Sequence, residues 1–118
     1  MYNVHVFNYS AKVTKVIDGD TVDCLVDLGF GIFKNERFRI KELNTKEIRK
    51  IKGYTEKDVE DGKMAKMDAE YLLYGDDVTV KTHQDKKGKY GRYLADVILS
   101  DGRSFSDIMK KIGHHYPR

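Results

Sequence analysis

The chain has 118 residues and carries 22 lysine and arginine side chains against 19 acidic ones, a net charge of +3. This length supports one domain with its own core, and the single cysteine, Cys24, excludes an internal disulfide framework. The apolar runs are far shorter than the ~20 residues that span a bilayer, and no signal peptide is visible. We therefore expect a single domain over residues 1–118, monomeric, intracellular or virus-encoded, and not associated with a membrane.

The basic side chains are concentrated in two segments. Residues 34–52 carry eight basic and three acidic side chains, residues 81–93 carry five and one, and residues 56–77 are acidic. If the fold brings the two basic segments together, they form a positive face suited to a polyanionic partner. For the run 48–52, contact with nucleic acid and plain exposure to solvent both stay open.

Alternating and β-branched apolar residues predict strands in the first third of the chain. The pair Asp18-Gly19 favours a tight hairpin turn, because it accepts a positive φ. The strictly alternating apolar residues from Val22 to Leu28 are typical of a half-buried strand. Residues 1–10 alternate irregularly and form either an extra strand or an N-terminal arm. The pattern predicts an antiparallel meander of strands over residues 11–17, 22–28 and 32–43.

A long, polar and charged loop follows Leu43, and such loops in small domains are often functional. A helix is predicted to begin near Asp61 or Lys63 and to end at Tyr74. Its larger apolar side chains recur on one stripe, and we expect the two methionines of this stripe to pack the helix onto the barrel: Met64, Met67, Tyr71 and Leu72.

The last part of the chain predicts two more strands and a second helix. The strands include Val78 and Val80 and then residues 93–99. Ser104 is typical of a helix N-cap, and Gly113 of a C-terminal stop. The order of three strands, helix, two strands, helix fits a β-rich α+β fold, namely a five-stranded OB-fold-like Greek-key barrel with two to three helices.

Four short stretches carry residue types that suit phosphate chemistry. Carboxylates at Asp20 and Glu47 and the amide oxygen of Asn44 are the hard ligands that Ca²⁺ or Mg²⁺ requires. Arg39 and Arg92 could grip a phosphate, because each guanidinium binds two oxygens. A nearby carboxylate could activate water for attack on phosphorus, provided that the stretches converge in space. The stretches are Ile17-Asp18-Gly19-Asp20-Thr21, Phe38-Arg39-Ile40, Asn44-Thr45-Lys46-Glu47 and Lys89-Tyr90-Gly91-Arg92.

In this order the four stretches resemble the signature of the staphylococcal nuclease (thermonuclease) family, over about Ala11 to Gly113. The resemblance implies a phosphodiesterase that cuts DNA and RNA with Ca²⁺, or with Mg²⁺ or Mn²⁺ in its place. It implies that the metal is held by the side chains of Asp20 and Asn44 and by the backbone carbonyl of Thr45.

The resemblance also implies the remaining roles. Glu47 would be the general base, and Arg39 and Arg92 would bind the scissile phosphate and stabilise the charge of the transition state. Lys89 and Tyr90 fall where the family contacts a terminal nucleotide phosphate. Tyr116 stands in for a substrate-stacking tyrosine.

Two residues depart from the family pattern. Asn44 replaces the usual aspartate, which keeps an oxygen ligand but removes a negative charge, so weaker metal binding is expected. Lys46 replaces a proline, which frees the φ of the loop and adds a cation near the metal. Because neither change removes the base or an arginine, we expect an active nuclease. The alternatives are a nucleic-acid-binding module that has lost catalysis and, more weakly supported, a protein-interaction barrel.

Simpler structural roles are expected for a few other residues. Asp18 caps its turn rather than binding metal, and Cys24 is a small buried apolar side chain. The histidines lie at the surface or in the tail, because no spacing connects them to a carboxylate cluster: His5, His83, His114 and His115.

Overall fold

The structure is a computed structural model that describes residues 6–87 and 92–116. Its elements follow the predicted order: β1 (Val6–Asp18), β2 (Thr21–Asp27), β3 (Phe33–Ile40), α1 (Glu56–Leu73), β4 (Asp77–Lys87), β5 (Tyr93–Ile98) and α2 (Phe105–Ile112). Within the described ranges, no helix is long and apolar enough to cross a membrane.

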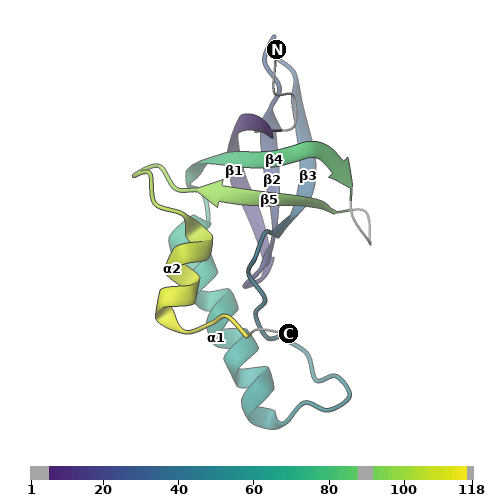
Figure 1. Cartoon of the computed structure of the whole chain (residues 1–118), viewed down its shortest axis with the longest axis vertical. Helices are drawn as coiled ribbons and strands as arrows, with labels where there is room; N and C mark the ends of the chain where they lie inside the picture. Colours follow the sequence, from purple (N-terminus) through teal and green to yellow (C-terminus); the bar gives the residue numbers. More distant parts are fainter. Residues whose placement is uncertain (1–5, 88–91, 117–118) are drawn as a thin grey trace.

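The five strands close into a barrel in the order β1-β2-β3-β5-β4 (Figure 1). The first three form the predicted antiparallel meander, with Val13 opposite Cys24 between β1 and β2. β1 starts at Val6 and also pairs with β4, so the described residues before position 11 extend this strand. A short parallel ladder over residues 38–40 of β3 and 93–95 of β5 closes the barrel. The expected β-rich fold with an OB-fold-like barrel is confirmed.

The alternating strand residues build the core as predicted. Val22, Cys24 and Val26 of β2 point inward and are buried, as are Phe38 and Ile40 of β3. Because side chains alternate between the two faces of a strand, Arg39 lies on the opposite side from its apolar neighbours. Strand β3 therefore contributes Phe38 and Ile40 to the barrel core and places Arg39 on the outside of the barrel.

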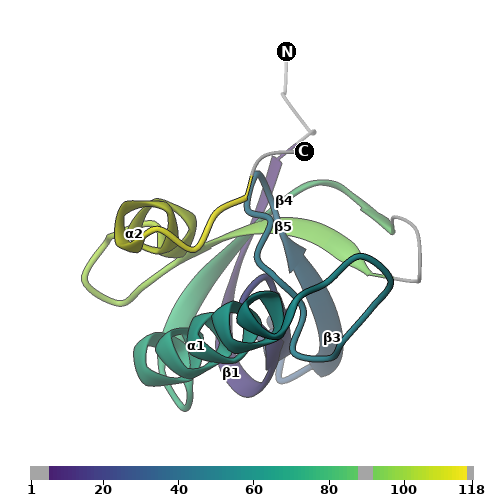
Figure 2. The same cartoon turned by 90° about the horizontal axis from the view of Figure 1, so that it is seen from below.

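Both helices lie at one end of the barrel, and α1 crosses that end when it is seen from below (Figure 2). In α2 the predicted caps are confirmed. The Ser104 side chain accepts the N–H of Asp107, and Gly113 ends the helix with a φ of 105°.

Helix α1 begins earlier than predicted, at Glu56. Thr55 is its N-cap. The Thr55 side chain accepts the N–H of Asp58, and the Asp58 carboxylate accepts the N–H of Thr55. This reciprocal capping box satisfies two backbone donors at once, and acidic residues in the first turn suit the positive end of a helix. Residues 56–60, which the sequence pattern assigns to the end of the long charged loop, therefore belong to the helix.

The expectation that Met64 and Met67 pack α1 onto the barrel is wrong. Both side chains are more than half exposed, and the buried face consists of small residues and one leucine: Gly62, Ala65, Ala69 and Leu73. The reason is a close approach between helix and loop. A Cβ built on Gly62 would lie 2.0 Å from the carbonyl oxygen of Glu47. No side chain larger than that of glycine fits at position 62, where the helix is closest to the loop.

Candidate active site around Asp20 and Arg39

Asp20 is the buried anion of the site. It follows the turn between β1 and β2 and is only 7% exposed. Its Oδ1 accepts the hydroxyl of Thr21 at 3.1 Å, and its Oδ2 accepts the backbone N–H of Thr45 at 3.0 Å. Arg39 Nη2 lies 3.3 Å from the same Oδ2. A buried carboxylate needs such partners, and here they come from β2, β3 and the loop after β3.

Arg39 connects Asp20 with that loop. Its Nη1 donates to the backbone carbonyls of Ile40, at 2.8 Å, and Leu43. Its Nη2 donates to Oδ1 of Asn44 at 3.3 Å. The guanidinium therefore fixes the bend after β3, and it brings two residues from separate sequence motifs, Asp20 and Asn44, to one point.

Arg92 reaches the same place from the start of β5. Its Nη1 donates to the Thr21 hydroxyl at 3.5 Å, and that hydroxyl in turn donates to Asp20. The short ladder pairs Phe38 with Tyr93 and Arg39 with Leu94, and so it brings Arg92, the residue before β5, close to Arg39. Arg39 thus contacts Asp20 directly, and Arg92 is connected to it through the Thr21 hydroxyl.

Thr45 packs tightly beneath this group and is 5% exposed. A Cβ on Gly19 would lie 2.9 Å from Thr45 Oγ1 and 2.8 Å from the Cβ of Ala65. The glycine of the turn is therefore required, because it lets the turn, the loop and α1 meet. This packing holds the Thr45 backbone against Asp20.

Burial and the neighbouring Asp20 carboxylate raise the pKa of the Asp18 carboxyl to about 7. Its Oδ1 accepts the backbone N–H of Asp20 at 3.2 Å, which is the turn cap predicted from the sequence.

Glu47 and Lys46 follow Thr45 but turn away from this contact network. The Glu47 backbone N–H donates to Tyr54 Oη at 3.0 Å, whereas its carboxylate is 46% exposed and lies 3.8 Å from Arg49. The Lys46 ammonium group lies 3.4 Å from Asp58 in the first turn of α1. The charge added by Lys46 is therefore balanced at the helix N-terminus.

The C-terminal residues form a part of the site that sequence reasoning missed. His115 Nδ1 accepts the backbone N–H of Asn44 at 3.0 Å. His114 Nε2 lies 2.6 Å from the Asp68 carboxylate, and its side chain is only 12% exposed. Both histidines lie in the tail after α2, as expected, but they are half-buried and contact Asn44 and Asp68, which no spacing in the sequence indicated. About seventy positions separate His115 from Asn44, so no local pattern could have shown the contact.

Of the three predicted substrate contacts, the structure describes Tyr116. Tyr116 lies beside the site, with its hydroxyl donating to Asp61 of α1 at 3.0 Å and its ring centroid 4.6 Å from Lys46 Nζ. Lys89 and Tyr90 fall outside the described residues.

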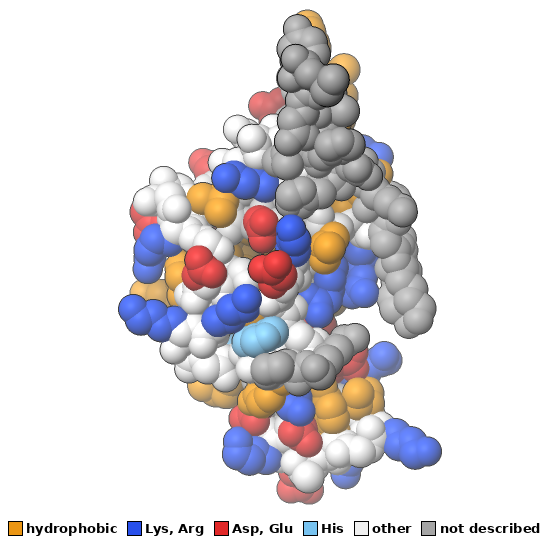
Figure 3. Space-filling view, viewed as in Figure 1, with side chains coloured by type: hydrophobic (Ala, Val, Ile, Leu, Met, Phe, Trp, Pro, Cys, Tyr) orange, Lys and Arg blue, Asp and Glu red, His pale blue; other side chains and the backbone are white. Residues whose placement is uncertain are grey.

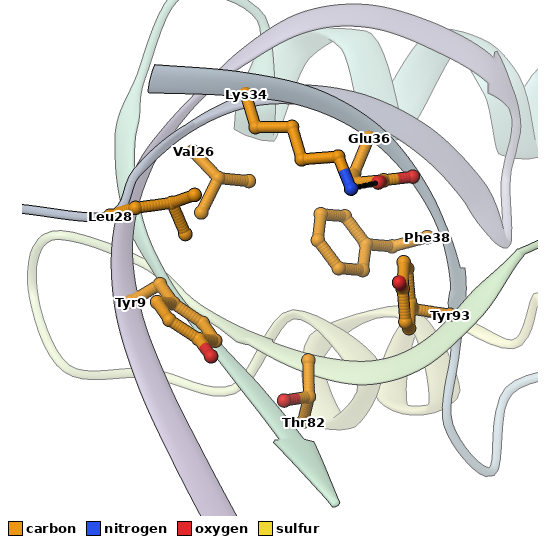
Figure 4. A pocket seen from close by; sticks show the side chains of 8 residues that line it. All are labelled: Tyr9, Val26, Leu28, Lys34, Glu36, Phe38, Thr82 and Tyr93. Atoms are coloured by element: carbon orange, nitrogen blue, oxygen red, sulfur yellow. Dashed lines mark ion pairs between the residues drawn. The ribbon is translucent and has the colours of Figure 1, made fainter. Parts of the chain in front are cut away.

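A cavity of about 270 Å³ opens at the mouth of the barrel (Figure 4). Its walls include Tyr9, Phe38 and Tyr93, and an ion pair of 2.8 Å joins Lys34 and Glu36 at its rim. Phe38 and Tyr93 are the chain neighbours of the two arginines, but Asp20, Arg39, Asn44 and Arg92 do not line the cavity. On the surface shown in Figure 3, acidic and basic side chains are intermingled over the left part of the view, and lysine and arginine side chains gather to the right of its centre.

A family model described as "Staphylococcal nuclease homologue" matches residues 37–115, whereas no curated protein matches the chain. The match contains both arginines, the loop from Asn44 to Glu47 and His115, and it begins after Asp20. It covers well over half of the sequence, and the barrel agrees with it. The chain belongs to the staphylococcal nuclease homologue family.

Proposed function

We propose that this protein is a metal-dependent nuclease that hydrolyses phosphodiester bonds in DNA or RNA, with Ca²⁺ as the expected ion. One observation carries the proposal: the Asp20 carboxylate, the Asn44 amide oxygen and the Arg39 guanidinium meet at one point. Arg92 joins them through the Thr21 hydroxyl. Oxygen ligands beside paired guanidinium groups suit a bound cation and a phosphate together.

The oxygen atoms of Asp20 and Asn44 are suitable ligands for a hard cation, which we expect them to bind with modest affinity. Asp20 Oδ2 and Asn44 Oδ1 each lie 3.3 Å from the same atom, Arg39 Nη2, so the guanidinium holds the two oxygens close together. The described residues contain no group of three or more histidine, cysteine or acidic side chains able to hold a metal. One carboxylate with neutral oxygens is a weaker set than two carboxylates, because affinity for Ca²⁺ follows ligand charge.

In the proposed reaction, Asp20, Asn44 and the backbone carbonyl of Thr45 would hold the ion, and a bound ion would supply Lewis-acid polarisation of a phosphate oxygen. Arg39 and Arg92 bind the phosphate and stabilise the negative charge that grows in the transition state. Because Arg39 Nη1 is anchored on two backbone carbonyls, the guanidinium is held beside the site before substrate arrives.

Glu47 is the proposed general base, accepting a proton from the attacking water on a carboxylate oxygen. Its backbone is fixed by Tyr54, and its ion pair with Arg49 is exposed and loose, so the carboxylate can turn toward the phosphate. Lys89, Tyr90 and Tyr116 are the proposed contacts to the rest of the nucleotide.

Cleavage of a supercoiled plasmid and of a labelled oligonucleotide, with Ca²⁺, Mg²⁺, Mn²⁺ or EDTA, tests the proposal. Arg39→Gln and Glu47→Gln should each lower turnover by about 10²–10³-fold, the loss typical of one essential electrostatic or proton-transfer group. Arg37→Gln is the matched control, because Arg37 lies on the same strand but pairs with Asp23 at 2.7 Å on the surface. Full activity of Arg39→Gln, or cleavage unaffected by EDTA, would contradict the mechanism.

A second candidate function is nucleic-acid binding without catalysis. The single carboxylate and the engagement of both ends of the Asn44 amide, by Arg39 and by Tyr116, favour it. It predicts salt-sensitive binding of oligonucleotides with no metal-dependent cleavage.

A further inference from the structure

After α2 the chain turns back toward the loop that follows β3. Gly113 makes this turn possible with its positive φ, and the next residues lie beside Asn44 (Figures 1 and 2). We call His115 and Tyr116 the C-terminal latch, because these two residues contact Asn44 directly.

Three hydrogen bonds join the latch to Asn44. The Asn44 N–H donates to His115 Nδ1 at 3.0 Å, and the Tyr116 N–H donates to the Asn44 carbonyl at 2.7 Å. The Asn44 side-chain Nδ2 donates to the Tyr116 carbonyl at 2.8 Å. Both backbone polar groups of Asn44 and one end of its side chain are therefore held by the C-terminus.

The third bond fixes the direction of the Asn44 amide. Its nitrogen can only donate and its oxygen can only accept, so an amide that gives Nδ2 to the Tyr116 carbonyl must present Oδ1 elsewhere. That oxygen accepts from Arg39 Nη2 at 3.3 Å. With the amide reversed, two donors would face each other. The latch thus determines which atom of Asn44 meets Arg39.

Tyr116 is itself held from two sides. Its hydroxyl donates to Asp61 of α1, and the Lys46 ammonium group lies over its ring. The latch therefore spans the loop and the helix, and it is anchored independently of Asn44.

We propose that the C-terminal latch is a positioning element of the site: His115 and Tyr116 orient Asn44 and, through it, Arg39 and Asp20. The inference deepens the proposed nuclease function and rests on it for its catalytic consequence. It also gives a physical reason for the asparagine. An aspartate at position 44 would have no donor for the Tyr116 carbonyl and would place a negative charge against that oxygen.

Amide hydrogen exchange of the full chain, combined with turnover and calorimetric Ca²⁺ titration, tests the latch. In His115→Ala the Asn44 amide should exchange about tenfold faster, because it loses its acceptor, and the Thr45 amide should follow. Turnover and Ca²⁺ affinity should fall by several-fold. His115→Asn should restore slow exchange, since its Oδ1 offers an acceptor near the position of the imidazole Nδ1.

His114→Ala is the control, because this neighbouring histidine pairs with Asp68 of α1 and not with Asn44. Its Asn44 amide should exchange as in the wild type. Unchanged exchange in His115→Ala, or equal acceleration in both alanine variants, would overturn the latch. Exchange needs no catalysis, so a chain that fails to cleave nucleic acid still tests the latch. If the protein cleaves nucleic acid but exchange is unchanged in His115→Ala, the latch is refuted and the proposed nuclease function is not.

Discussion

Replacement of Gly62 by alanine should destabilise the protein, although alanine favours a helix. The added Cβ would lie 2.0 Å from the carbonyl oxygen of Glu47, 2.5 Å from its carbonyl carbon and 2.9 Å from the carbonyl oxygen of Lys46. All three atoms are backbone, so no side chain can swing aside. Helix α1 must move away from the loop that carries Thr45.

The two effects oppose each other, and the clash is the larger. Alanine gains about 1 kcal/mol over glycine inside a helix. Overpacking a close-packed site costs about 1–3 kcal/mol, and contact with rigid backbone belongs at the upper end of that range. The net loss is about 2 kcal/mol. With an unfolding entropy of about 2.1 cal/mol/K per residue, this loss lowers Tm by roughly 8 °C for a chain of this length.

Thermal unfolding followed by circular dichroism measures the effect. Lys63→Ala is the control, because Lys63 is the next residue on α1 and is exposed, so its Tm should change little. Nuclease activity of Gly62→Ala should fall as well, since the loop moves with the helix. A variant as stable as the wild type, or more stable, would refute the close approach of α1 to the loop.

Three further outcomes are expected. Asn44→Asp should bind Ca²⁺ more tightly in calorimetric titrations, because the aspartate adds a negative charge. In EDTA the same variant should be about 1 kcal/mol less stable, because it loses the hydrogen bond to the Tyr116 carbonyl. An unchanged Tm in EDTA would contradict the role of that bond. Met67→Lys should change stability by less than about 0.5 kcal/mol in denaturant titrations, because Met67 is 60% exposed. A loss of several kcal/mol would show instead that Met67 packs in the core. Burial, with a smaller effect of Asp23, raises the Cys24 pKa from 9.0 to about 12. Iodoacetamide should therefore react only on unfolding, and stability should decline as pH rises from about 9 to about 12, since the unfolded thiol ionises first; rapid alkylation of the folded chain at pH 8 would contradict this.

The strands and their caps could be predicted because their signals are local. The alternation of Val22, Cys24 and Val26 has the two-residue period of a strand. Ser104 and Gly113 indicate the two ends of α2, because each interacts with backbone groups only a few residues away. Asp20 and Arg39 each lie in a short motif of the family signature, but only the structure shows that the two side chains meet. Local chemistry is visible in a sequence because it acts over a few positions.

The misjudged features depend on distant parts of the chain. Hydrophobicity favours Met64 over Gly62 as a packing residue, yet the backbone of the loop leaves room only for glycine. The His115 contact joins positions 71 residues apart. Neither the space at a helix face nor such a pairing leaves a periodic signal, so only the folded chain reveals them.

The parallel seam between β3 and β5 has a consequence for how activity arises. Only residues 38–40 and 93–95 are paired there, and these segments are far apart in sequence. Positions 38 and 93 are 55 residues apart, so the ladder forms only once both segments have been brought together. Arg39 lies within the seam and Arg92 directly before it. Until β5 pairs with β3 the two arginines are apart, so the proposed site is complete only when these two strands meet.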